Sequence, residues 1–166
     1  MNKQEASPRV IKLIWGLKES FRNYVEATGG TVGVERGAER TPDGAIAFAP
    51  ITDEALSLDS QGKPQGQGKF LGDVKFQGHG GMLSVHLGDP IIEIGDAGGS
   101  LTVVVDGTSS RLEIARLDLS AMSEGEAGEL LIPTTLSMDG CHLLDNHYPS
   151  GTVLDPIRLV RAVPTS

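Results

Sequence analysis

The chain has 166 residues, enough for one domain that buries a core without staples. Its formal net charge of −8 opposes binding to phosphate backbones, so we expect no nucleic-acid partner. Twenty-two glycines and only 4% aromatic residues favour a turn-rich β protein over a helical one. The lone Cys141 excludes an intramolecular disulfide and a cysteine-cluster metal site.

The first nine residues, MNKQEASPR, are polar and predict a flexible tail ahead of a single domain over residues 10–166. No apolar run reaches the length of about 20 residues that crosses a bilayer, so we expect no transmembrane segment. The sequence as written shows no secretory signal. It therefore predicts a cytoplasmic protein, or one of the cell envelope if the N-terminus has been trimmed.

Two hydrophobic periods compete in the N-terminal segment. Alternating apolar residues favour a strand over residues 10–17, and a glycine in this stretch argues against a continuous helix. After it, Phe21, Tyr24 and Val25 follow the i, i+3, i+4 spacing of one helical face. The spacing predicts a short helix over Glu19–Ala27.

The rest of the chain alternates short apolar runs with turn residues, which predicts a mainly β fold: a single-domain antiparallel β-sandwich or a partly closed barrel. The turn signals include Asp139-Gly140, and the composition of Gln61–Gly68 predicts a mobile loop. The predicted strands are Thr31–Glu35, Ala45–Phe48, Leu56–Leu58, a pair within Phe70–Pro90, Ile91–Ile94, Leu101–Val105, Leu112–Leu119, Leu130–Leu136 and Val153–Val160.

The pair within Phe70–Pro90 meets at a bend formed by His79-Gly80-Gly81. Glycines there let the backbone pass close to another body, and His79 carries an imidazole into the same space. In the alternative interpretation the glycines serve only positive φ angles, and His79 is a solvated turn residue. The local pattern leaves both interpretations open.

The two tyrosines, Tyr24 and Tyr148, lie where the chain changes element. A tyrosine on the inner face of a short helix is usually a core residue. As a phenolate, however, it is a hard ligand for ferric iron, and an imidazole hydrogen-bonded to its oxygen favours the ionised form. The histidines form no helical zinc pair, and no P-loop or nucleophile-elbow motif occurs.

Three separated blocks of sequence carry a resemblance to a known family. They read WGLKESFRNY from Trp15, VKFQGHGGMLSVHLGDP from Val74 and YPSGTVLDP from Tyr148. In this order they resemble the HtaA domain, a haem-binding domain of bacterial cell-surface haem-uptake proteins. The resemblance covers essentially the whole chain.

The resemblance implies a role for one residue in each block. Tyr24 matches the axial ligand of the haem iron, His79 matches the histidine that supports it, and Tyr148 matches a second tyrosine that lies against the porphyrin or a propionate. The implied fold is a β-rich domain with one short N-terminal helix beside the ligand pocket. The implied function is haem binding for haem transfer or buffering, with haem as the cofactor.

Two other functions remain open at this stage. One is a cofactor-independent cytoplasmic isomerase, dehydratase or lyase in which Tyr24 and His79 act as general acid and base on a flat apolar small molecule, assisted by a pocket carboxylate. The other is a structural β domain without a small ligand, and homo-oligomerisation is open in every case. The haem and the enzyme hypotheses both predict His79 within hydrogen-bond reach of the Tyr24 hydroxyl, at about 2.6–3.2 Å or through one bridging water.

Overall fold

The computed structural model describes residues 10–51, 56–96, 98–105, 110–125, 128–144 and 148–161, so the tail expected over residues 1–9 lies outside the described part. No described helix is long and apolar enough to cross a membrane. The helices are α1 (Glu19–Ala27), α2 (Met138–Leu143) and the short 3-10 turns η1 (His79–Gly81) and η2 (Leu119–Ala121). The strands are β1 (Val10–Trp15), β2 (Thr31–Glu35), β3 (Glu39–Arg40), β4 (Ile46–Pro50), β5 (Ser57–Leu58), β6 (Pro64–Leu71), β7 (Asp73–Gly78), β8 (Leu83–Gly95), β9 (Gly98–Val104), β10 (Arg111–Leu117), β11 (Ser123–Glu124), β12 (Leu130–Leu136) and β13 (Val153–Arg161).

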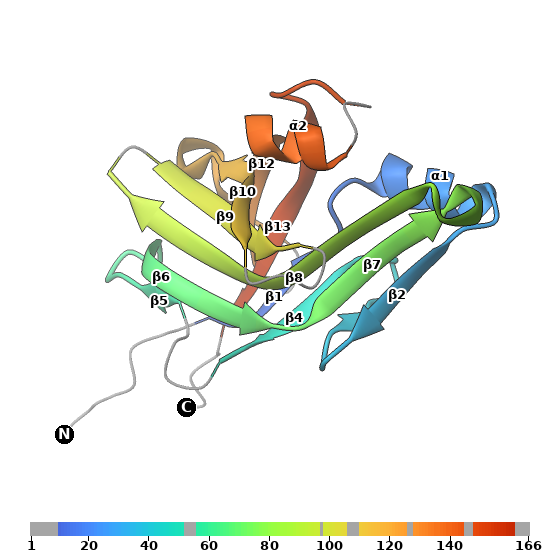
Figure 1. Cartoon of the computed structure of the whole chain (residues 1–166). Coiled ribbons are helices and arrows are strands. Elements are labelled where there is room, and N and C mark those ends of the chain that lie inside the picture. The colour runs from blue at the N-terminus through green and yellow to red at the C-terminus, as the bar shows by residue number, and fades with distance from the viewer. Residues whose placement is uncertain are drawn as a thin grey trace.

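Eight strands close into an antiparallel barrel in the order β8, β9, β10, β12, β13, β1, β4 and β6, and β6 pairs back with β8. β7 and β2 continue the sheet from β8 beyond the barrel. Figure 1 shows β7 and the adjoining part of β8 running away from the barrel towards α1, while α2 lies at the same end, above β10 and β12. The predicted mainly β fold is confirmed, in its closed barrel form.

The long strand β8 serves both parts of the sheet. Its first part, from Leu83 to Gly88, pairs with β7, and its second part pairs with β6 and β9. Between them lies a bulge at Asp89, where φ is 44°, followed by Pro90, which has no N–H to donate. The strand predicted separately over Ile91–Ile94 is thus the continuation of β8 after this bulge.

The barrel interior is filled by alternate side chains of its strands, as the pleat requires. In β12 the alternation is complete: Leu130, Ile132, Thr134 and Leu136 are buried, and the residues between them are partly exposed. The Thr134 hydroxyl donates to the Asp155 carbonyl oxygen at 2.7 Å, so this one polar inward position is satisfied.

The mobile loop predicted over Gln61–Gly68 is wrong, because β6 begins at Pro64 and pairs with β8 through Gly66 and Gly68. The composition misled the prediction because a glycine there permits a close approach. A Cβ at Gly68 would lie 2.5 Å from the Leu56 Cβ, closer than two carbon atoms can pack. The glycine that suggested flexibility is required by packing.

The turn predicted at Asp139-Gly140 is also wrong, because these residues lie in α2. The Ser137 hydroxyl caps this helix by accepting a hydrogen bond from the Gly140 N–H at 2.9 Å. Gly140 is buried against β10: a Cβ there would lie 2.5 Å from the carbonyl oxygen of Ile114. Its small size lets a short helix lie directly on the barrel.

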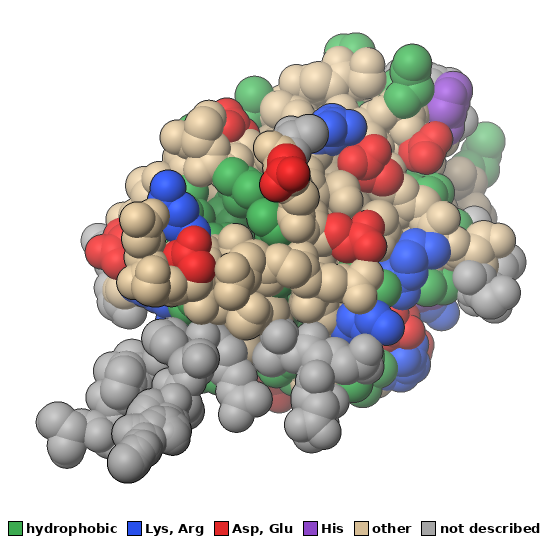
Figure 2. Space-filling view, turned by 90° about the vertical axis from the view of Figure 1, so that its left-hand side faces the viewer, with side chains coloured by type: hydrophobic (Ala, Val, Ile, Leu, Met, Phe, Trp, Pro, Cys, Tyr) green, Lys and Arg blue, Asp and Glu red, His purple; other side chains and the backbone are tan. Residues whose placement is uncertain are grey.

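Charged side chains of both signs share the surface. The face shown in Figure 2 carries both Asp and Glu side chains and Lys and Arg side chains, and several of the Lys and Arg side chains lie near one another at its lower right. Ion pairs join distant strands and turns, such as Arg158 with Asp43 at 3.0 Å and Arg161 with Glu124 at 2.8 Å. Exposed pairs of this kind contribute little stability individually.

Candidate ligand-binding site

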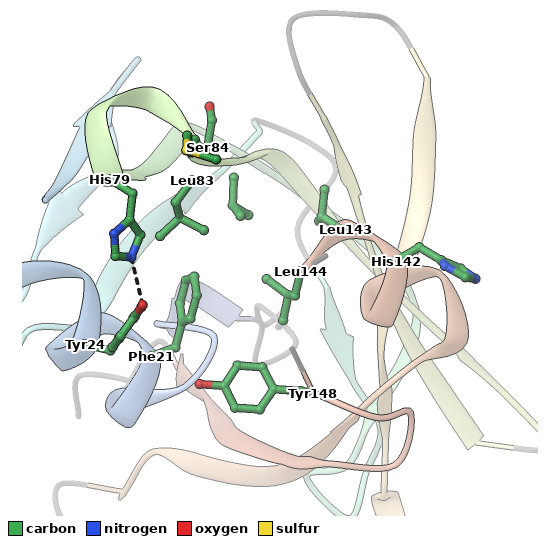
Figure 3. Close-up of a pocket in the computed structure, with 11 residues that line it drawn as sticks. Phe21, Tyr24, His79, Leu83, Ser84, His142, Leu143, Leu144 and Tyr148 are labelled. Carbon is green, nitrogen blue, oxygen red and sulfur yellow. Dashed lines mark hydrogen bonds between the residues drawn. The ribbon is translucent and has the colours of Figure 1, made fainter. Parts of the chain in front are cut away.

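A cavity of about 830 Å³ opens where β8 leaves the barrel. It lies between α1 and η1 on one side and α2 on the other (Figure 3). Its volume is within the range of about 300–1,000 Å³ that is common for small-molecule sites. The lining residues are Phe21, Tyr24, His79, Met82, Leu83, Ser84, Val85, His142, Leu143, Leu144 and Tyr148.

Tyr24 and His79 meet at one wall of this cavity. The Tyr24 hydroxyl oxygen lies 2.8 Å from Nε2 of His79, and the ring centroids are 5.6 Å apart. Figure 3 shows the two side chains directed towards each other from α1 and η1. The hydrogen bond that the sequence predicted between residues 55 positions apart is therefore present. Its donor depends on the imidazole tautomer.

The turn η1 presents His79 in a left-handed conformation, with φ of 52°. Gly80 and Gly81 continue it at φ of 65° and 97°, and the Met82 N–H closes the turn on the His79 carbonyl at 3.2 Å. A Cβ on either glycine would meet nothing within 4 Å, so these glycines serve the backbone angles and not a close approach. The interpretation that the glycines serve only positive φ angles is thus right. His79, however, is not a purely solvated residue, because it is hydrogen-bonded to Tyr24.

The helix α1 presents Tyr24 at the edge of its buried face. Phe21 and Val25 are buried, but Tyr24 is 47% exposed. The interpretation of Tyr24 as a core residue is therefore wrong, although the predicted bounds of α1 are confirmed. A tyrosine that keeps half its surface exposed beside a cavity is accessible to a ligand.

Tyr148 lines the same cavity from the segment that precedes β13. Its side chain is half-buried, and Figure 3 shows its hydroxyl directed towards the α1 side. The structure thus brings Tyr24, His79 and Tyr148 to one cavity. It does not assign them a role.

The opposite wall, from α2, was missed by the sequence analysis. Leu143 and Leu144 line the cavity there, and Figure 3 shows His142 turned away from Tyr24 and His79. A signal was available, because Ser137 is a preferred N-cap residue and Asp139 places an acidic side chain in the first turn after it. Reading Asp139-Gly140 as a turn concealed it.

The cavity lining is mostly apolar, and none of its residues is Asp, Glu, Lys or Arg. The assisting carboxylate of the enzyme hypothesis thus has no counterpart among the described lining residues. The polar groups that remain are the two tyrosine hydroxyls, the imidazoles and Ser84. This set suits a large apolar ligand that is held at a few polar points.

The fold is similar to solved structures from Corynebacterium glutamicum. The C-terminal domain of HtaA is 24% identical, with a TM-score of 0.72, over 94% of this chain and 100% of that one. The N-terminal domain of HtaA is 23% identical, with a TM-score of 0.70, over 93% and 98%. The haem-binding protein HtaB is 21% identical, with a TM-score of 0.65, over 93% of each chain.

The sequence comparisons give the family directly. No curated protein sequence matches the chain. The sequence model of the HtaA family, described as Htaa, matches residues 11–160, which is nearly the full length. The chain belongs to the HtaA family.

Proposed function

We propose that this protein binds haem, with Tyr24 as the axial ligand of ferric iron, His79 as the hydrogen-bond partner of that ligand and Tyr148 against the porphyrin or a propionate. The observation that carries the proposal is the 2.8 Å hydrogen bond between Tyr24 and His79 at the wall of an apolar cavity. Membership of the HtaA family and the similarity to the haem-binding protein HtaB support it.

The donor chemistry of the site fits a ferric porphyrin. A phenolate oxygen is a hard anionic ligand, as in the tyrosine-ligated haem of catalase. When bound, haem supplies a ferric ion that takes such a ligand. The chain must then release the proton of the Tyr24 hydroxyl, and Nε2 of His79 lies where it can accept or share that proton.

The remainder of the cavity fits the two ends of the ligand. The apolar side chains of α2 and β8 would cover a porphyrin face. The hydroxyls of Ser84 and Tyr148 could donate hydrogen bonds to its propionates. The described lining residues include no Lys or Arg, so the proposed affinity depends on the iron–oxygen bond and on apolar contact. Because Tyr24 is half-exposed, haem can reach this side chain and leave it without passing through the core, which suits transfer or buffering of haem.

The test is a titration of the purified protein with haemin, followed at the Soret band and at the charge-transfer bands of iron–phenolate ligation. We expect saturation at one haemin per chain and loss of the phenolate bands in Tyr24→Phe. A wild-type spectrum identical to that of free haemin would refute the proposal. The acid–base hypothesis for Tyr24 and His79 would gain support only if a metal-free turnover were then found and lost in both variants.

A further inference from the structure

Asp155 in β13 binds the helix that carries Tyr24 at two points. Its Oδ1 accepts a hydrogen bond from the backbone N–H of Glu19 at 3.0 Å, and its Oδ2 accepts one from Nη1 of Arg22 at 2.6 Å. Glu19 is the first residue of α1, and Arg22 lies one turn further along. One carboxylate therefore holds both the start and the first turn of the helix.

The helix has no such cap of its own. Lys18 at its N-terminal boundary makes no side-chain capping bond, so the Glu19 N–H is capped by a residue 136 positions away. With nine residues, α1 is shorter than the roughly 12–15 that an isolated helix needs to be even marginally stable. Its position thus depends on contacts from outside, of which this cap is one.

The ion pair with Arg22 strengthens this dependence. Arg22 is only 5% exposed, and Nη1 also donates to the Gly16 carbonyl oxygen at 3.0 Å. A buried guanidinium that loses its carboxylate keeps the cost of desolvation without the compensating attraction. Without the charge of Asp155, the first turn of α1 would shift to bring Arg22 into water.

The backbone of Asp155 is fixed by contacts that do not involve its carboxylate. Its N–H donates to the Leu17 carbonyl oxygen at 2.9 Å, and its carbonyl oxygen accepts Nε1 of Trp15 at 2.7 Å, besides the hydroxyl of Thr134. The carboxylate therefore projects from a firmly held position in the barrel wall. It joins α1 to the barrel.

We infer that Asp155 is a positioning residue that sets the orientation of α1 and thereby the contact between Tyr24 and His79. Arg22 and Tyr24 lie two residues apart, so they face nearly opposite sides of the helix, and a rotation that frees Arg22 moves Tyr24. His79 is held by η1, a separate element, and would not follow. The consequence for ligand binding rests on the proposed haem function.

Asp89 provides a matched control. Its Oδ1 accepts the Gly72 N–H at 3.2 Å and Nη2 of Arg36 at 2.8 Å, so it too joins a backbone amide to an arginine. Its side chain is 27% exposed, against 28% for Asp155, but the side chain of its arginine is 48% exposed where that of Arg22 is 6% exposed, so the two sites match in the carboxylate and differ in the burial of the guanidinium. It lies in the bulge of β8 and is not among the residues that line the cavity, and its hydrogen-bond partners Gly72 and Arg36 lie outside α1.

The experiment compares wild type with Asp155→Asn and Asp89→Asn, each checked for folding by thermal melting. Asparagine keeps the shape and an oxygen for the cap but loses the charge. Amide hydrogen exchange of the haem-free protein reports α1, and a haemin titration reports the ligand site. We expect faster exchange across α1 and about tenfold weaker haemin binding in Asp155→Asn, with weaker iron–phenolate bands, and neither change in Asp89→Asn.

If Asp155→Asn does not fold, Arg22→Lys tests the side-chain contact alone: a lysine loses the guanidinium geometry that serves both Gly16 and Asp155, while the cap of Glu19 remains, so we expect changes in the same direction but smaller. Unchanged exchange of α1 would overturn the inference, as would faster exchange with unchanged haemin binding and bands. If wild type fails to bind haemin specifically, the proposed function is lost. Faster exchange of α1 in that case would still show that Asp155 holds the helix.

Discussion

The ring of Tyr148 stands edge-on to the ring of Phe21, with centroids 6.2 Å apart and planes inclined by 75°. Phe21 makes a second edge contact, with Phe76, at 5.3 Å. These residues come from the three sequence blocks that resemble the HtaA domain. The blocks therefore meet around Phe21, which lines the cavity together with Tyr24, His79 and Tyr148.

Replacing Tyr24 by phenylalanine should abolish iron ligation by this residue and leave the folding of the protein nearly unchanged. The ring and its contacts remain and only one exposed hydrogen bond is lost, so the free energy of unfolding should change by less than about 1 kcal/mol. Ferric haemin, in contrast, should lose its phenolate ligand and the associated charge-transfer bands. Urea unfolding and a haemin titration on the same preparation measure the two effects. A variant that keeps these bands would show that another residue ligates the iron.

Replacing His79 should give a graded effect. Asparagine is the preferred substitution because it tolerates the left-handed backbone at this position. Without the imidazole the Tyr24 hydroxyl loses the partner that orients it, so haemin binding should weaken but persist. Haemin titrations of both proteins measure this change, with the elution volume checked so that a change of oligomeric state is not mistaken for a change of affinity. Complete loss of binding would mean that His79 is itself a ligand.

Cys141→Ser should leave haemin binding unchanged. Cys141 is partly buried in α2 but does not line the cavity, although its neighbours His142 and Leu143 do. The expected cost is about 1 kcal/mol of stability, because a hydroxyl replaces a thiol that packs against the core. A lower haemin affinity in a folded Cys141→Ser protein would place the ligand deeper under α2 than proposed.

The ionised carboxylate of Asp43 should stabilise the folded protein, and this stabilisation should be lost at low pH. A hydrogen bond from Thr41, aided by Arg158, lowers the pKa of Asp43 to about 2 in the folded chain. Because the folded pKa lies below the unfolded one, the contribution is present above about pH 4 and is lost as the pH falls towards 2. Its carboxylate is 58% exposed, so the effect should stay below about 1 kcal/mol.

Urea unfolding of wild type and Asp43→Asn at a series of pH values measures this contribution. The difference in free energy of unfolding should be largest near neutral pH and should disappear towards pH 2. If the difference in free energy of unfolding were the same at every pH, the charge of Asp43 would not be the source of its stabilising effect.

Local sequence patterns correctly predicted the elements whose conformation is determined by residues close to them in the sequence. The bounds of α1, β2 and β12 follow from apolar spacing, and the bend at His79 follows from its glycines. The contact between Tyr24 and His79 was expected because two blocks of a known family were recognised. Apolar spacing alone would have placed Tyr24 in the core.

What the patterns missed depends on distant partners. Gly68 and Gly140 read as flexible or turn-forming, but each is needed where another part of the chain passes within contact distance. The cap of α1 by Asp155 was equally hidden, because nothing near position 19 in the sequence indicates it. Barrel closure also requires a pairing between β6 and β8, and the first part of β6, residues 64–68, lay within a segment that composition described as a loop.

Closure of the barrel also limits how copies of this protein can associate through their backbones. Within the described residues the strand order ends at β2 and β5, and β5 has only two residues. The outer edge of β2 is partly covered, because Nη1 of Arg40 donates to the Val32 carbonyl oxygen at 3.4 Å. Among the described strands, intermolecular strand pairing, the usual first step of β aggregation, therefore finds only short edges: β2, where Arg40 occupies one carbonyl oxygen, and the two-residue strands β3, β5 and β11.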